Sequence, residues 1–183
     1  PDYKVGNYKT IMKKIKKALI SVSNKKELKD LLRVLTKYKI KLISSGGTYK
    51  EIKKLKFKCL EVSEYTGSPE ILGGRVKTLH PKIHAGILSK RSNKSHRKDL
   101  QNNNFEEIDL VIVNFYPFEK TLERTNNHLE IIENIDVGGP TMVRSAAKNY
   151  NDVTVITSSE QYSQLIDEIK KNKGSTSIEF REK

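Results

Sequence analysis

Short apolar runs alternate along this chain with segments whose apolar residues recur at helical spacing, and this alternation constrains the fold more than any other feature. The run at residues 18–22 is followed by leucines spaced as on the buried face of a helix, namely Leu28, Leu31, Leu32 and Leu35. Short strands alternating with helices predict a parallel sheet that is covered by helices on both faces. We therefore predict an α/β fold, a three-layer, Rossmann-like arrangement.

The rest of the chain continues the pattern. We predict further strands at residues 42–43, 60–62, 108–113 and 153–156, and helices at 49–55, 129–135, 141–147 and 162–170. Phe115 and Phe118 are expected in the core, whereas the polar segment 92–104 is predicted to be a surface helix or loop without a chemical role. Residues 1–16 are predicted to be a flexible extension that precedes one domain at 17–183.

The composition narrows the classes of partner. Lys and Arg number 35 against 22 Asp and Glu, a formal charge of +13 that would suit a phosphate-rich partner. This excess is spread along the chain, which favours a solvated lysine-rich surface over a nucleic-acid-binding module, the alternative whose affinity would fall steeply with salt. Cys59 is the single cysteine, and no apolar stretch approaches the ~20 residues of a membrane span. We expect a cytoplasmic protein that binds neither nucleic acid nor membrane.

Ligands of parallel sheets bind beyond the carboxyl ends of the strands, so the residues after each strand are candidates. Residues 21–25 place hydroxyls at the start of a helix, and residues 44–48 add Gly46 and Gly47, which let the backbone approach an anion. Helix capping and an ordinary turn are the plainer interpretations of the two segments. Because adjacent strands would bring them together, we predict a phosphate site with Lys25 as its counter-charge.

Two later segments carry groups suited to polar chemistry. In the loop 73–81, Arg75 offers a planar fork and Lys77 a mobile charge for an oxyanion, while His80 is either a base or structural and His84 is structural. Asn114 and Tyr116 follow the strand at 108–113 and are predicted to enter the same crevice as an amide reader and a phenol.

A carboxylate and an amine flank the helix predicted at 141–147. Asp136 and Lys148 each have a plain interpretation as helix-end charges. If both face one pocket together with Lys77, they form a proton-transfer set.

The blocks Gly-Gly-Arg-Val-Lys-Thr-Leu-His-Pro at 73–81 and Asp-x-Gly-Gly-Pro-Thr-Met-x-Arg-x-Ala-Ala-Lys-Asn at 136–149 occur with the segments 21–25, 45–48 and 114–118. In this order they resemble the amino-terminal inosine monophosphate (IMP) cyclohydrolase domain of the bifunctional formyltransferase and cyclohydrolase family of purine biosynthesis. The resemblance runs from Ala18 through Ile178. It implies a methylglyoxal-synthase-like fold, a homodimer, and closure of a formamido-imidazole-carboxamide ribotide to IMP with loss of water, without metal or cofactor.

The resemblance also implies roles for individual residues. The catalytic residues that it implies are Lys148, Lys77, Tyr116 and Asp136. From their chemistry we assign Lys148 as the proton donor and acceptor, Lys77 and Tyr116 to polarising the formyl oxygen, and Asp136 to orienting or deprotonating the amide. Contacts to the purine ribonucleotide fall on Ser21, Ser23, Lys25, Ser45, Gly46, Gly47, Thr48, Arg75, Thr78, Asn114 and Gly138.

Two departures from the family pattern stand out. Asn24 occupies a position where the family usually has Asp, which leaves Ser23 and Lys25 in place. The formyltransferase domain that the family carries after this region is expected to be absent here and to belong to the full-length protein. The alternative to an enzyme is a regulatory module of the same fold, which would bind a nucleotide without turning it over.

Overall fold

The computed structural model describes residues 12–115 and 118–183. Its centre is a five-stranded sheet in the order β4-β3-β2-β5-β6. The strands are β2 (Lys17–Val22), β3 (Lys41–Ser44), β4 (Leu60–Glu61), β5 (Leu110–Asn114) and β6 (Thr154–Ile156). Every neighbouring pair is parallel. The chain adds strands outward in one direction from β2 and then in the other from β5, so the topological switch point lies between β2 and β5.

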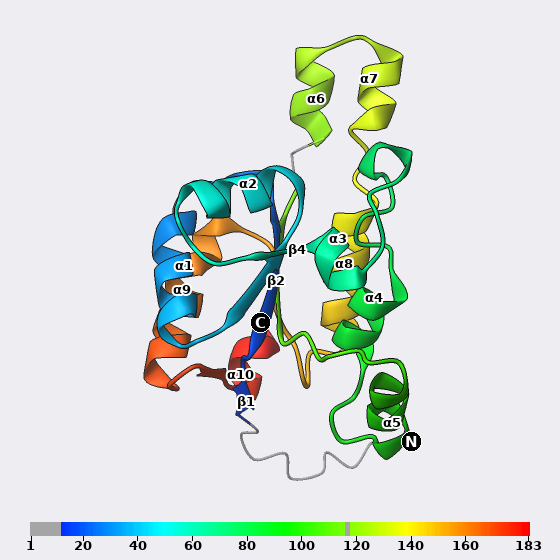
Figure 1. Cartoon of the computed structure of the whole chain (residues 1–183). Coiled ribbons are helices and arrows are strands. Elements are labelled where there is room, and N and C mark those ends of the chain that lie inside the picture. Colours follow the sequence, from blue (N-terminus) through cyan, green and yellow to red (C-terminus); the bar gives the residue numbers. More distant parts are fainter. Residues whose placement is uncertain (1–11, 116–117) are drawn as a thin grey trace, which may run out of the picture.

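The two faces of the sheet pack against different helices (Figure 1). Strand β2 shows the alternation, because Ala18, Ile20 and Val22 belong to one core cluster and Leu19 to the other. The first cluster includes side chains of α1 (Leu28–Lys37), α2 (Gly46–Lys54) and α9 (Tyr162–Lys171). The second includes side chains of α3 (Val62–Thr66), α4 (Pro81–Leu88) and α8 (Gly138–Lys148). The predicted three-layer α/β fold is confirmed.

Several short elements were not predicted. Helices α3, α4 and α6 (Phe118–Arg124) and the 3-10 turn η1 (Leu72–Gly74) lie where the sequence suggested polar loop or no element. Helix α4 carries a recognisable start, because Pro81 is its first residue and His80 Nδ1 accepts a hydrogen bond of 3.0 Å from the backbone N–H of Lys82. Of the two interpretations of His80, the structure supports the structural one.

The predicted surface segment and the remaining short elements complete the fold. Helix α5 (Lys94–Asn102) lies on the surface, and α7 (His128–Glu133) overlaps the helix predicted at 129–135. The rest are η2 (Ser159–Gln161), α10 (Ile178–Arg181) and the strands β1 (Lys13–Lys14) and β7 (Ser175–Thr176). Among the described residues, no helix is both long enough and apolar enough to cross a membrane.

Two expectations about packing need correction. Residues 13–16 were predicted to belong to a flexible extension, but β1 pairs antiparallel with β7 and Ile15 is 1% exposed in the core. Residues 1–11 of the predicted extension lie outside the described residues. Phe115 and Phe118 are each 39% exposed rather than buried. They follow the end of β5, so neither side chain lies on a face of the sheet.

Helices α6 and α7 form a hairpin that projects from the body of the molecule (Figure 1). Large apolar side chains on it are exposed, including Leu122 on α6 and Leu129 and Ile132 on α7. A hairpin of this kind leaves apolar surface without an intramolecular partner.

Candidate active site

A cavity of about 450 Å³ lies beyond the carboxyl ends of β2 and β3. It is bounded by the ends of these strands, by the loop that contains η1, and by the segment that leads from α7 into α8. The predicted site residues that line it are Ser21, Ser45, Arg75, Lys77, Thr78, Asp136 and Gly138. The structure therefore brings together groups from four distant parts of the sequence.

The amino terminus of α2 lies beside this cavity and is a candidate anion site. Helix α2 begins at Gly46, so the predicted Gly-rich turn is its first helical turn, where backbone N–H groups lack intrahelical acceptors. Lys77 Nζ lies 3.4 Å from the position that a Cβ on Gly46 would take, and Lys25 Nζ lies 3.7 Å from the corresponding position on Gly47. Ser45 precedes the helix and its hydroxyl makes no capping bond. Two ammonium groups and free backbone donors thus converge at the positive end of a helix dipole.

Thr48, predicted as a phosphate contact, uses its hydroxyl within the fold. The Thr48 hydroxyl accepts a hydrogen bond from Val22 N–H and donates one to Val22 C=O, both at 3.0 Å. Thr48 is 5% exposed. Its side chain connects α2 to the end of β2, and only its backbone N–H remains on the candidate anion-binding turn.

Asn114, the last residue of β5, connects β5 to the turn that follows β2 at the switch point. Its Oδ1 accepts hydrogen bonds from Ser23 N–H at 2.7 Å, from the Ser23 hydroxyl at 3.0 Å and from Asn24 N–H at 3.0 Å. Its Nδ2 donates to the hydroxyl of Tyr162 at 3.3 Å, and burial raises the pKa of Tyr162 to about 12. Asn114 and Ser23 do not line the cavity in the described part of the chain. Here Asn114 shapes the turn that follows β2.

The loop 73–81 lies against the start of α8 at very short range. A Cβ on Gly138 would stand 2.5 Å from Thr78 Oγ1, so the absence of a side chain permits this approach. Thr78 is 6% exposed, whereas Arg75 is exposed and forms an ion pair of 3.3 Å with Glu133. Glu133 lines the same cavity and was missed in the sequence, where nothing distinguishes it from other surface acids.

Asp136 both caps a helix and faces the cavity. Its Oδ1 accepts a hydrogen bond of 2.9 Å from the backbone N–H of Gly139 in the first turn of α8. The residue is exposed and lines the cavity. The helix-end interpretation of Asp136 therefore holds, and the carboxylate is still accessible to a ligand.

Lys148 is a predicted catalytic residue that does not line this cavity. Lys148 is the last residue of α8 and lines a separate cavity of about 360 Å³ with Asp152 and Arg181. Eleven helical residues span about 16 Å, which separates Lys148 from Asp136 within one chain. Tyr116 lies outside the described residues.

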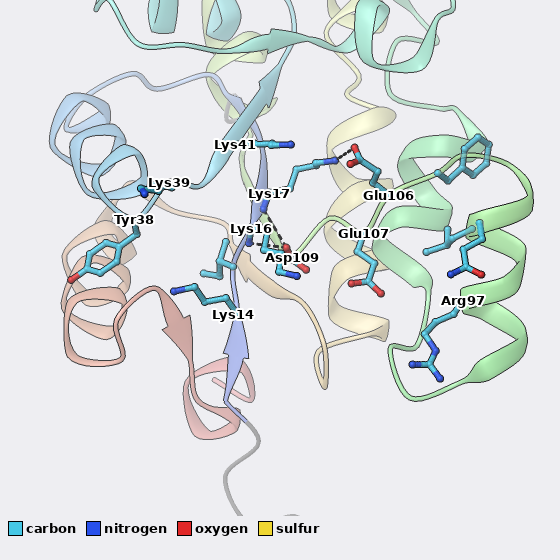
Figure 2. A pocket seen from close by; sticks show the side chains of 14 residues that line it. Lys14, Lys16, Lys17, Tyr38, Lys39, Lys41, Arg97, Glu106, Glu107 and Asp109 are labelled. Carbon is cyan, nitrogen blue, oxygen red and sulfur yellow. Dashed lines mark hydrogen bonds and ion pairs between the residues drawn. The ribbon is translucent and has the colours of Figure 1, made fainter.

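Another cavity, of about 720 Å³, lies near the amino ends of the strands and is rich in lysine (Figure 2). Two of its acidic side chains have partners within the fold. Glu106 forms an ion pair with Lys17, and Asp109 accepts hydrogen bonds from the backbone N–H groups of Lys16 and Lys17. No predicted site residue lines it in the described part of the chain. Among the described residues there is also no cluster of three His, Cys, Asp or Glu side chains that would hold a metal.

Residues 27–141 match the family model described as MGS-like domain. The chain belongs to the MGS-like domain family. In this MGS-like domain protein, residues 146–183 also match the model described as AICARFT/IMPCHase bienzyme.

Curated relatives of this MGS-like domain share about half of its residues. The bifunctional purine biosynthesis protein PurH of Prochlorococcus marinus (strain MIT 9301) is 51% identical over 155 residues, 84% of this chain and 30% of that protein. PurH of Trichormus variabilis is 50% identical over 168 residues, 91% of this chain and 33% of that protein. The chain therefore spans about a third of the length of these relatives.

A solved structure has the same fold as this MGS-like domain. The crystal structure of ForH superposes with a TM-score of 0.78 at 27% identity, covering 91% of this chain and 87% of that one. This agreement confirms the predicted methylglyoxal-synthase-like fold.

Proposed function

We propose that this domain is an IMP cyclohydrolase, which closes 5-formamido-1-(5-phosphoribosyl)imidazole-4-carboxamide to inosine monophosphate. The observation that carries the proposal is the placement of Lys77 and Asp136 in one cavity beside the anion site of α2. The match of residues 146–183 to the AICARFT/IMPCHase bienzyme model and the names of the PurH relatives, bifunctional purine biosynthesis proteins, support the proposal.

The substrate phosphate binds at the first turn of α2, between Lys25 and Ser45, and the imidazole extends into the cavity toward Asp136. The carboxamide nitrogen attacks the formyl carbon and forms the new C–N bond. The formyl oxygen becomes an alkoxide that Lys77 stabilises. It leaves as water, with one proton from the carboxamide nitrogen and one from the formamido nitrogen, which generates the aromatic ring. Asp136 orients or deprotonates the carboxamide.

The proposal includes a homodimer. Large apolar side chains that line the cavity, Ile132, Ile135 and Val137, are exposed by more than a third, as are Ile71 and Leu72 in the adjoining loop and Leu122 and Leu129 on the α6–α7 hairpin. A second copy that covers these side chains would bury them and exclude water from the cavity. Lys148, which is remote from Asp136 in its own chain, acts in the cavity of the partner protomer. The full-length protein carries the formyltransferase domain and resides in the cytoplasm.

Direct turnover tests the proposal. The purified chain is incubated with the formylated ribotide, without metal or folate, and IMP formation is followed by ultraviolet absorbance. We expect turnover that Lys77→Ala lowers about 100- to 1,000-fold, the usual effect of removing one oxyanion donor. Lys54→Ala, at the exposed end of α2, should leave turnover unchanged. Tight binding of IMP without turnover would instead support the regulatory module, and nucleic-acid binding that falls steeply with salt would support the charge-based alternative.

A further inference from the structure

Lys77 has a partner that the proposed reaction does not use. Its Nζ lies 3.3 Å from Oε1 of Glu70, and the side chains are 29% and 46% exposed. Both residues line a cavity of about 290 Å³ that adjoins the active-site cavity, since Lys77 and Ser45 line both. Of these two cavities, Glu70 lines the smaller one.

The backbone next to the Glu70–Lys77 pair is a glycine, Gly74. Gly74 has a φ of +87°, in the left-handed region that favours glycine. A Cβ there would stand 2.8 Å from Glu70 Oε1 and 2.9 Å from Lys77 Nζ. The bare α-carbon of Gly74 thus leaves the space in which the Glu70 carboxylate and the Lys77 ammonium meet.

Lysine needs such a restraint more than arginine would. Its four-carbon stem is flexible and its ammonium is a point charge without a planar fork to fix its direction. Held by Glu70 over Gly74, the Lys77 Nζ stands next to the first turn of α2. Without the carboxylate, the same ammonium samples positions in solvent as well as in the cavity.

We propose that Glu70 is the positioning residue for Lys77, holding its ammonium where the formyl oxygen develops charge. The inference rests on the proposed function for the identity of the reaction, although the Glu70–Lys77 contact itself does not. An exposed ion pair contributes little to stability, so the role predicts a change in turnover with little change in folding.

A double-mutant cycle tests the coupling. We expect Glu70→Gln to lower kcat/KM about 10-fold, because misplacement of a catalytic group costs rate steeply, and Glu70→Asp to restore part of it. In a Lys77→Ala background, Glu70→Gln should cause no further loss. Glu64→Gln is the matched control, because it removes one carboxylate from nearby α3 without touching Lys77. Equal losses with and without Lys77, or an unchanged rate in Glu70→Gln, would overturn the proposal.

A measurement independent of activity separates this inference from the proposed function. The ¹⁵N signal of the Lys77 side-chain ammonium, assigned by its loss in Lys77→Ala, should be observable in the wild type and in Glu64→Gln but broadened beyond detection in Glu70→Gln. A signal that is unchanged in Glu70→Gln would contradict the positioning role of Glu70. If the wild type shows this signal but no turnover, the proposed cyclohydrolase activity is contradicted, whereas the Glu70–Lys77 contact is not.

Discussion

The carboxylate of Asp136 accepts a hydrogen bond of 2.9 Å from the backbone N–H of Gly139 while it faces the candidate active site. One side chain thus serves two purposes, since it satisfies a donor in the first turn of α8 and offers negative charge to a ligand. The two purposes are separable by substitution, because an amide oxygen can cap a helix but cannot take up a proton at neutral pH.

Asp136→Asn should therefore lower turnover strongly and preserve the fold. We expect kcat to fall at least about 100-fold, the usual contribution of a positioned acid or base, with the urea midpoint unchanged. Asp136→Ala should lose about 1 kcal/mol of unfolding free energy as well, because the cap is removed. Full activity in the Asn variant would show that the carboxylate only caps the helix.

Thr48 should prove structural when its hydroxyl is removed. Thr48→Val leaves the buried N–H and C=O of Val22 without their partner, and we expect a loss of about 1–3 kcal/mol in urea unfolding. Thr48→Ser retains the hydroxyl and should cost only about 1 kcal/mol for the lost methyl group. If Val at this position weakened phosphate binding at unchanged stability, the hydroxyl would be a ligand contact after all.

His84 should make stability depend on pH. Burial lowers the pKa of His84 below its ordinary value of 6.5, while its Nδ1 lies 3.1 Å from the Ser145 hydroxyl. The unfolded chain therefore binds a proton more readily than the folded one, so the free energy of unfolding falls as the pH drops below that value.

The comparison is thermal unfolding between about pH 7.5 and about pH 5.5, where histidines titrate. We expect a flatter profile in His84→Gln than in the wild type. His128→Gln, which replaces an exposed histidine at the start of α7, is the control and should follow the wild type. A His84→Gln profile as steep as that of the wild type would assign the effect to other groups.

The position of Lys148 predicts complementation between inactive subunits. Asp136→Asn and Lys148→Ala chains, each inactive alone, should regain about a quarter of wild-type activity when unfolded and refolded together at equal concentration. Half of the resulting dimers are mixed, and one of the two sites in each combines an intact Asp136 with an intact Lys148 from its partner. The assay is the same ring closure, and a mixture as inactive as its components would place Lys148 outside the partner's site.

The sheet was predictable because buried parallel strands are continuous apolar runs that the sequence displays directly. Val62 shows the limit: it was predicted to belong to the strand at 60–62, but it begins α3, and such a short helix adds no period of its own. Helix α4 did carry a signal, a proline at its first position with Ile83 and Ile87 one turn apart, both fully buried.

The candidate site was predictable where chemistry is concentrated in one irregular loop, as with Arg75, Lys77 and Thr78. Glu70 and Glu133 could not be found, because a carboxylate on a lysine-rich chain becomes meaningful only once its partner's position is known. The prediction that Asp136 and Lys148 share one pocket within the chain did not take into account the rise of the helix between them.

The two ends of helix α8 line different cavities, Gly138 the active-site cavity and Lys148 the cavity with Arg181. Its length fixes how far Lys148 stands from Asp136, and each residue added or removed would turn one end about 100° relative to the other. Substitutions on its outer face alter neither quantity, whereas a single deletion alters both. The number of residues between Gly138 and Lys148 is thus as tightly constrained as their identity.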